Sequence, residues 1–360
     1  MRSFGLTWKG LLRRAPALAA ILLSLGLASR QGEALFLSSS AVWVGGTADG
    51  HPLVLRAAPA PMEVWILPEP GRVHALARGY AAGEAAGDVA LWKLQENAPP
   101  APVLRLGGPQ KERATGLVRA GKALVLAGDA GGTYFGPSRG GRDVFALWVD
   151  ERTQAVTARF HWGSDNDDVL TAVAPAPGGG VYLAGYEEVN EDCIPVAERG
   201  FVLRVGPRGL VWAFRFGLDA ASRPVALLTD AGGVWVAGQT DGPLFADARG
   251  GDDVFLLHLD PAGRVLSRAQ WGSPLSDLPV DFLTGPLGQR YLVLESANEQ
   301  GAFVPRLIRL GPRGEAEAKA RLSGPAGAHL RAARRQGSVL WLLFNTPSDF
   351  TLETQPWPLR

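Results

Sequence analysis

Apolar residues along this chain fall into short runs that are separated by turn residues. Between Asp168 and Phe216 the runs "VLTAV", "VYLAG", "FVLRV" and "LVWAFRF" begin at Val169, Val181, Phe201 and Leu210. The turn sequences "GGG" and "GPRG" separate the first run from the second and the third from the fourth. Such runs, rich in Val, Leu and aromatic residues, predict four antiparallel β-strands.

This four-strand unit repeats along the chain. "LVLAG" at Leu124, "VYLAG" at Val181 and "VWVAG" at Val234 occupy the same place in successive units, at spacings of 57 and 53 residues. Related runs bring the occurrences to seven; they begin at Val42, Ala75, Tyr291 and Trp341. A fixed period of this length is the mark of a repeat architecture, and it has to be recognised before any single motif is interpreted.

Repetition of four-stranded antiparallel units predicts an all-β fold, a β-propeller, because its blades bury their apolar faces against one another. We expect seven blades, with six as the alternative, and incomplete first and last blades. The first blade, near Leu35 to Pro61, has only "APAP" where a fourth strand belongs, and the last begins near His329. The two ends then pack or pair with each other to close the ring.

The repeat is clearest in "GGVWVAGQT" and "ADARGGDDVFLLHLDPAGRVLSRAQWGS", which together span most of residues 232–273. This pattern resembles the bacterial β-propeller repeat family that is often called SBBP repeats. The resemblance covers about residues 117–296. It implies a multi-bladed propeller of exported bacterial proteins, and it implies no particular chemistry because the family has no single established activity.

The N-terminal residues have the pattern of a secretory signal. Basic residues and no acids occupy positions 1–14, and the apolar run "APALAAILLSLGLA" follows over 15–28. We predict a signal peptide over 1–28, with cleavage possible as late as Ala34, and a single propeller domain over 35–360. An uncleaved anchor is the alternative. No later segment is apolar enough to span a membrane, so we expect an exported protein that is periplasmic, on the cell surface or secreted.

Composition excludes several classes of partner. The 36 Lys and Arg residues balance 35 Asp and Glu residues, so nothing in the charge favours nucleic acid. The single cysteine, Cys193, permits no intrachain disulfide. Pairing of Cys193 with another chain stays open. We expect a monomer whose partner is a protein, a peptide or a glycan.

One motif suggests catalysis. Gly136 to Gly140 reads G-x-S-x-G, the nucleophile elbow of serine hydrolases, with Ser138 as its serine. That motif needs a helix after the serine, whereas here it lies between two predicted strands. Its counterpart in the repeat, residues 246–250, keeps only Arg249 and Gly250. We therefore interpret it as a blade loop and predict no catalytic residue.

Acidic residues and histidines suggest no metal or cofactor site. "SDNDD" (164–168) lacks the spacing of a calcium loop. We interpret "EEVNEDC" (187–193) as a solvent-exposed loop, with a cation site as the alternative. The five histidines fall in different units without the spacing of zinc ligands. We expect Asp88, Asp143 and Asp253, which recur just before third strands, to accept hydrogen bonds from the amides of their own turns.

In a propeller, the connections from second to third strands and from one blade to the next lie on one face, here called the long-loop face. Its longest predicted loops span 129–142, 162–168, 187–199 and 239–252. Loops on a rigid scaffold are the usual place for binding residues. The candidate binding residues are Tyr134, Arg139, Arg142, Trp162, Glu188, Asp247, Arg249 and Trp271. Counting charges predicts an acidic long-loop face and a basic opposite face.

The function that fits these patterns best is an exported, non-catalytic propeller that binds or scaffolds through its long-loop face. A hydrolase or lyase acting on polysaccharide is the first alternative, and it requires carboxylates that converge near the central channel. A structural component of an envelope or surface assembly is the second. Trp162 and Trp271, at matching repeat positions, are expected to pack between blades, with carbohydrate stacking as their other possible role.

Overall fold

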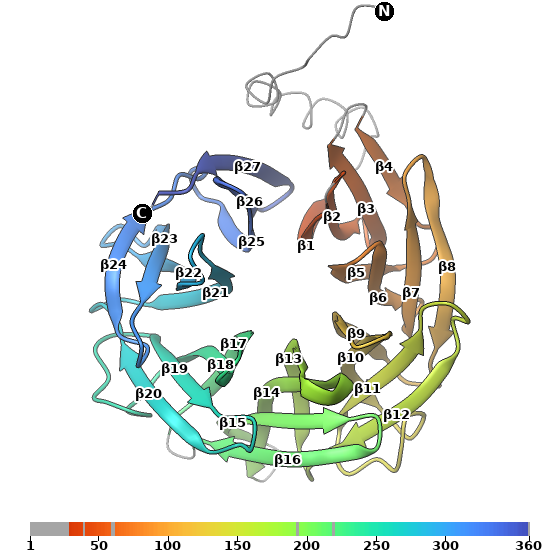
Figure 1. The fold of residues 1–360 in the computed structure, drawn as a ribbon, viewed down its shortest axis with the longest axis horizontal. Helices are drawn as coiled ribbons and strands as arrows, with labels where there is room; N and C mark the ends of the chain where they lie inside the picture. The colour runs from red at the N-terminus through yellow and green to blue at the C-terminus, as the bar shows by residue number, and fades with distance from the viewer. Residues whose placement is uncertain (1–28, 39, 59–61, 192–193, 218–219, 359–360) are drawn as a thin grey trace, which may run out of the picture.

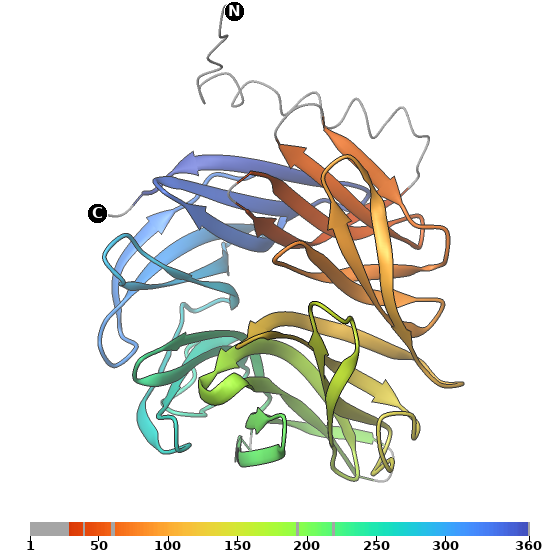
Figure 2. The same cartoon turned by 45° about the vertical axis from the view of Figure 1, so that its right-hand side comes forward.

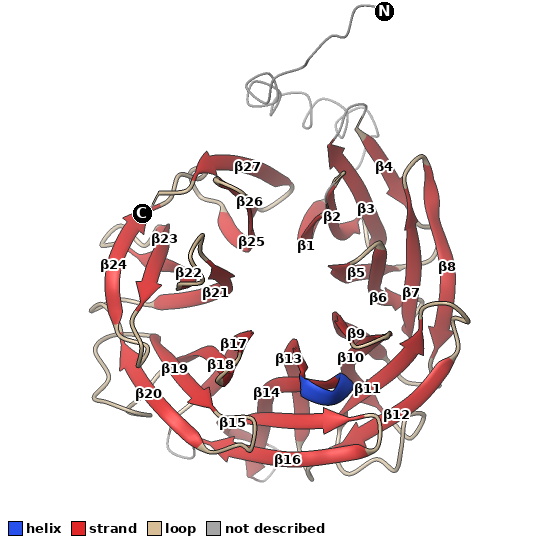
Figure 3. Ribbon diagram, viewed as in Figure 1, coloured by secondary structure: helices blue, strands red, loops and turns tan. Residues whose placement is uncertain are grey.

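The computed structural model describes residues 29–38, 40–58, 62–191, 194–217 and 220–358. Within these ranges the strands form seven antiparallel sheets arranged as the blades of a ring (Figure 1). A 45° turn shows the sheets radiating from the centre of the ring (Figure 2). The helical exception in the described chain is one 3-10 turn, η2 (Pro177–Gly179), in the fourth blade (Figure 3). The predicted all-β, seven-bladed propeller is confirmed, and the alternative of six blades is wrong.

Blades 1 to 3 each contain four strands in sequence order from the centre outward. Blade 1 consists of β1 (Arg30–Leu37), β2 (Val42–Ala48), β3 (His51–Ala58) and β4 (Glu63–Ile66). Blade 2 consists of β5 (Gly71–Ala77), β6 (Tyr80–Ala85), β7 (Asp88–Gln95) and β8 (Ala98–Leu106). Blade 3 consists of β9 (Glu112–Ala120), β10 (Ala123–Gly131), β11 (Arg142–Asp150) and β12 (Val156–Trp162).

Blades 4 to 6 repeat this order, and blade 7 has three strands. Blade 4 consists of β13 (Asp167–Ala176), β14 (Gly180–Glu191), β15 (Ile194–Gly206) and β16 (Gly209–Phe216). Blade 5 consists of β17 (Ser222–Asp230), β18 (Gly233–Thr240), β19 (Asp253–Leu259) and β20 (Val265–Trp271). Blade 6 consists of β21 (Asp277–Thr284), β22 (Arg290–Ala297), β23 (Phe303–Leu310) and β24 (Ala316–Arg321). Blade 7 consists of β25 (His329–Gln336), β26 (Val339–Asn345) and β27 (Phe350–Pro356).

Two details of the predicted blades are wrong. Blade 1 is complete, because β4 follows the proline-rich stretch that seemed to end the blade; only four residues long, it leaves a weak apolar run. In blade 2, Ala75 belongs to the first strand and not to the second. The chain turns directly after that strand, at Arg78 and Gly79, which have φ angles of 44° and 81°. The incomplete last blade is as predicted.

The apolar core lies between blades. Each of the seven clusters of buried apolar residues that the structure describes combines side chains from two neighbouring blades. Between blades 3 and 4, for example, Trp148 of β11 packs in the same cluster as Leu183 and Phe201 of blade 4. Removing a blade would therefore expose the apolar faces of both its neighbours.

The ring closes by packing of blade 7 against blade 1. Leu35 and Val44 of blade 1 share a cluster with Leu343 of blade 7. Buried Asn345 spans the joint: its side-chain oxygen accepts the Gly32 N–H at 2.9 Å, and its side-chain nitrogen donates to the Gly32 carbonyl at 3.0 Å. The first and last blades thus pack together, with β25 beside β1 at the centre of the ring (Figure 1).

The first strand begins at Arg30, five residues before the expected start of the domain at residue 35. Arg30 is buried and pairs with Asp349 at 3.0 Å, next to the closing joint. Cleavage after Ala34 would remove more than half of this strand. The predicted signal peptide, residues 1–28, lies outside the described residues. The described chain contains no helix that is long and apolar enough to cross a membrane.

A bulge in the first strand explains the glycine of the "LVLAG" and "VWVAG" runs. In each blade the pairing of first and second strands skips one residue of the first strand. In blade 3 this irregularity brings the Arg113 carbonyl against Gly128, where a Cβ atom would lie 1.8 Å from the oxygen. The same close approach occurs at four other second-strand glycines: Gly46, Gly83, Gly185 and Gly238.

We predict that Gly128→Ala destabilises the protein by about 1–3 kcal/mol, because the new methyl group would displace the first strand of blade 3. Gly206→Ala is the matched control, since a Cβ atom there meets nothing within 4 Å and its backbone needs no glycine. Urea unfolding measures both. Equal unfolding midpoints for the two variants would show that the bulge does not require glycine.

Candidate functional site

Blades 3, 4 and 5 carry the largest projections of the long-loop face. Residues 132–141 connect β10 to β11, and residues 241–252 connect β18 to β19. The loop predicted at 187–199 is wrong: β14 and β15 continue as a paired hairpin, with Glu187 opposite Arg199 and Glu188 opposite Glu198. Its residues are polar because the hairpin extends beyond the apolar core of the blade, and polarity alone made it resemble a loop.

Two buried aspartates hold the projecting loops of blades 3 and 5. Asp143 accepts the Arg139 N–H at 3.1 Å, and Asp253 accepts the Arg249 N–H at 3.0 Å, as predicted. Asp88 differs, because its carboxylate pairs with Arg105. A neighbouring side chain completes each anchor: His161 lies 3.1 Å from Asp143, and Gln270 donates to Asp253 at 3.0 Å.

The position of His161 bears on the G-x-S-x-G motif, because histidine bonded to aspartate is half of a catalytic triad. Ser138 donates its hydroxyl to the Gly140 carbonyl at 3.1 Å, and a loop-to-strand connection follows it. In blade 5, Gln270 occupies the place of His161 and accepts the amides of Leu244 and Phe245. Because Gln270 contacts the aspartate of the blade 5 loop as His161 contacts Asp143, we interpret the Asp143–His161 pair as a loop anchor.

The structure joins two of the candidate binding residues through an ion-pair group. Arg142 lies 3.3 Å from Asp129, 3.5 Å from Asp167 and 3.8 Å from Glu188. Asp129 is fully buried, and burial raises the pKa of its carboxyl against the opposing effect of Arg113 and Arg142. Arg142 therefore fixes the hairpin of blade 4 to blade 3, which is a structural use of its charge.

The two tryptophans of the candidate set face neighbouring blades. The Trp162 ring lies 4.8 Å from that of Phe201 in blade 4, and the Arg215 guanidinium covers it at 5.1 Å. Trp271 donates its indole N–H to the Gly314 carbonyl of blade 6 at 3.1 Å. Both rings are only partly exposed, and they pack at the blade interfaces as expected.

Four further candidates are exposed but do not converge. Tyr134 and Arg139 lie on the blade 3 loop, and Asp247 and Arg249 lie on the blade 5 loop. The hairpin of blade 4 stands between these two loops in the order of the ring. Among the eight candidate residues, the contact that the structure shows is between Arg142 and Glu188, and their role as a binding face stays a prediction.

The predicted separation of charge between the faces rests on counted charges, and burial and pairing reduce several of them. Two of the acids counted for the long-loop face, Asp168 and Glu187, are buried. The same face carries arginines, such as Arg142 and Arg199, that lie beside its acids. On the opposite face, Arg290 pairs with Asp230 at 3.1 Å. Charge totals ignore such burial and pairing, so the separation of charge stays a prediction.

Buried carboxyl groups lie together below the hairpin of blade 4. Burial is the main cause that raises the pKa of Asp168 to about 7; the charges of Glu187 and Asp143 act in the same direction, and hydrogen bonding from Ser164 opposes them. Among the described residues, no group of three His, Cys, Asp or Glu is arranged to hold a metal ion. Asp192 and Cys193, part of the "EEVNEDC" candidate, lie outside the described residues.

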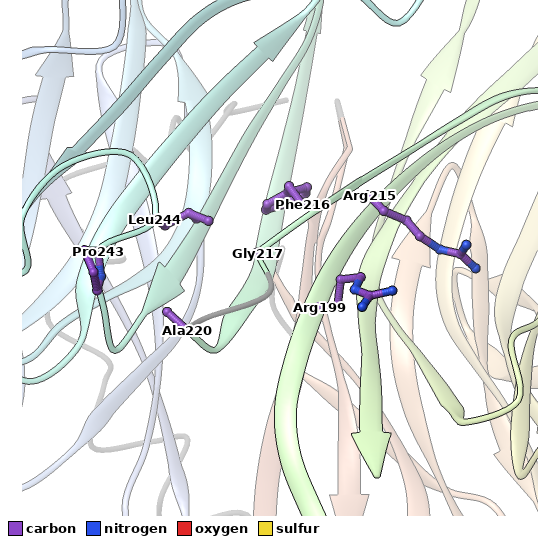
Figure 4. A pocket seen from close by; sticks show the side chains of 7 residues that line it. All are labelled: Arg199, Arg215, Phe216, Gly217, Ala220, Pro243 and Leu244. Carbon is purple, nitrogen blue, oxygen red and sulfur yellow. The ribbon is translucent and has the colours of Figure 1, made fainter. Parts of the chain in front are cut away.

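A pocket of about 420 Å³ lies between blades 4 and 5 on the long-loop face. Arg199 and Arg215 lie on one side of Gly217, and Ala220, Pro243 and Leu244 lie on the other, with Phe216 between them (Figure 4). Each guanidinium comes within 3.8 Å of the buried Glu187 carboxylate. The Arg199 and Arg215 side chains are 30% and 44% exposed, so both remain accessible to a ligand.

None of the pocket residues was a candidate from the sequence. They come from β15, from the end of β16, from the connection between blades 4 and 5, and from the blade 5 loop, and only the folded ring brings these segments together. A usable sign was present in "LVWAFRF", where Arg215 interrupts an apolar strand next to Phe216. The sequence alone does not give the register of the β14–β15 hairpin, so it could not place Arg199 beside Arg215.

No family model matches the chain, and no curated protein matches it either. Among solved structures, the chain is similar to the WD40 domain of Toxoplasma gondii coronin, with a TM-score of 0.54 and 12% identity over 92% of this chain and 85% of that one. It is similar to Drosophila Semaphorin 2a, with a TM-score of 0.52 and 8% identity over 92% and 74%. It also resembles polysaccharide lyase Uly1, with a TM-score of 0.53 and 10% identity over 91% and 90%.

The protein is a β-propeller. At these low identities the comparisons show the fold alone. The specific resemblance to SBBP repeats stays a prediction. A shared fold does not determine function, so the propeller's function has to be argued from its own site.

We predict that Asp168 makes the propeller less stable as the pH rises from about 4 to about 7. Its folded-state pKa of about 7 lies above the ordinary value of 3.8, so the folded protein holds a proton that unfolding releases in this window. The side chain at this position cannot ionise in the variant Asp168→Asn. Between pH 5 and pH 8, the free energy of unfolding of this variant should therefore rise on the order of 2–4 kcal/mol relative to that of the unmodified protein.

Denaturant unfolding at the two pH values measures this change. Asp165→Asn is the matched control, because Asp165 is exposed in the same connection. If both variants show the same pH dependence as the unmodified protein, Asp168 is ionised at low pH and the prediction is wrong.

Proposed function

We propose that this protein is an exported, non-catalytic binding propeller that holds a protein, peptide or glycan on its long-loop face. The observation that carries the proposal is the pocket between blades 4 and 5. It combines two accessible guanidinium groups with an apolar side made by Phe216, Pro243 and Leu244. A concave site with a few polar groups and an apolar wall is the usual form of a ligand site.

The contacts of the titratable residues support binding without catalysis. His161 and Asp143 anchor a loop, as Gln270 and Asp253 do in blade 5. Asp168 and Glu187 are buried, and Glu187 lies beside Arg199 and Arg215. The alternatives, a polysaccharide hydrolase or lyase and a structural part of an envelope assembly, remain outcomes of the experiments below. The likeness to polysaccharide lyase Uly1 is a likeness of fold and adds no catalytic residue.

The export part of the proposal rests on the N-terminal sequence pattern. We predict that residues 1–34, fused to an alkaline phosphatase that lacks its own signal, give phosphatase activity in a Gram-negative host. That enzyme becomes active only where its disulfides form, outside the cytoplasm. A fusion carrying Leu22→Arg and Leu23→Arg should be inactive because the apolar run is broken. Activity of neither fusion, or equal activity of both, would count against export.

The binding part predicts a specific loss. Labelled protein applied to arrays of glycans and of peptides should bind at least one class of ligand, and Arg215→Gln should weaken that binding about tenfold or more. Arg208→Gln, in the exposed turn between β15 and β16 on the opposite face, is the matched control and should leave binding unchanged.

Two results would contradict the proposal. Binding that Arg208→Gln weakens as much as Arg215→Gln does would place the ligand away from the pocket. Release of shortened or unsaturated products from an acidic polysaccharide, followed by chromatography, would make the protein an enzyme. Circular dichroism of each variant shows whether it is folded.

A further inference from the structure

The pocket lies beside a part of β15 that is paired on one edge only. β15 pairs with β14 along its whole length, from Ile194 onward, but it pairs with β16 only from Gly200. After Phe216 the chain leaves the sheet at Gly217, whose φ is 76°. Among the described strands, none pairs with the outer edge of residues 194–199. Alternate backbone N–H and C=O groups along such an edge point outward and can accept a further strand.

The charge at this edge favours an anion. One oxygen of Glu187 accepts a hydrogen bond from Asn166 at 2.9 Å, and its other oxygen lies 3.8 Å from both Arg199 and Arg215. Two guanidinium groups thus share one carboxylate. The Nε–H of Arg199 is buried and has no hydrogen-bond partner among the described residues. A second carboxylate that contacts the exposed parts of the two guanidinium groups would balance the charge.

The other side of the pocket fits an apolar side chain better than a sugar. Sugar rings stack on exposed aromatic faces, but Phe216 is only 9% exposed, and the ring of Trp162 is covered by Arg215. What the pocket offers is aliphatic: Ala220, Pro243 and Leu244. A volume of about 420 Å³ is enough for one large side chain with its terminal carboxylate.

We propose that the pocket takes the C-terminal residue of an extended peptide. Its carboxylate lies between Arg199 and Arg215, its last side chain packs on Pro243 and Leu244, and its preceding backbone pairs with the free edge of β15. Strand addition of this kind obtains affinity from main-chain hydrogen bonds and specificity from the terminal pocket. The inference rests on the proposed binding function, of which it names the ligand class.

Two immobilised hexapeptide libraries of the same composition test the proposal, one with a free C-terminal carboxylate and one with a C-terminal carboxamide. The full-length protein should be retained by the first library, with aliphatic residues selected at the last position, and about tenfold less by the second. Arg199→Gln and Arg215→Gln should each reduce retention about tenfold, and Arg208→Gln should not. Leu244→Trp, which fills the apolar side, should remove the selection at the last position.

Equal retention by the two libraries would overturn the proposal. So would retention of Arg199→Gln and Arg215→Gln at the level of the unmodified protein. A galacturonate hexasaccharide serves as the acidic glycan probe. If the protein binds it and neither library, and Arg215→Gln abolishes that binding, the peptide class is wrong while the proposed binding function stands. Absence of binding to all three probes would also overturn the peptide proposal. Folding of each variant is checked by its unfolding midpoint.

Discussion

The structure depends on contact between blades. No blade has a core of its own, because every described apolar cluster joins two neighbours. The joint between blades 7 and 1 is the one that chain connectivity does not provide, and there the burial of Leu35 and Leu343 is completed by the two hydrogen bonds between Asn345 and Gly32. The remaining six interfaces can persist as a ring only while this joint holds, since an opened ring exposes two apolar faces.

The residues that repeat along the chain are those that the backbone geometry of each blade requires. The glycine at the end of "LVLAG" is needed where a bulged first strand brings a carbonyl against Gly128. The aspartate before the third strand holds a loop amide, and the glycine of "WGS" leaves room for it: a Cβ at Gly163 would lie 1.8 Å from Asp143. These requirements are local in sequence, so they could be recognised without a structure. The fold and the blade count followed from them.

The candidate site could be predicted only in part, and the reason is physical. Loop length correctly placed the projections of blades 3 and 5, because a long connection must leave the blade. Side-chain environment was not accessible: Asp168 and Glu187 were counted as surface charge although the fold buries them. The pocket depends on contact between Arg199 and the connection to blade 5, which exists only once the hairpin register is fixed. Sequence repeats report what blades share, whereas this pocket is made of what blade 4 does not share.

That difference also shows where function can reside on a repeat scaffold. In blades 3 and 5 the loop anchors use different residues, His161 and Gln270, to hold the same aspartate position, so variation there changes nothing about the frame. Blade 4 instead extends both of its central strands beyond the blade and leaves one edge of β15 without a described partner. An unpaired edge next to two arginines is a liability in a monomer unless something covers it. The feature that departs from the repeat is therefore the place where we propose that a ligand binds.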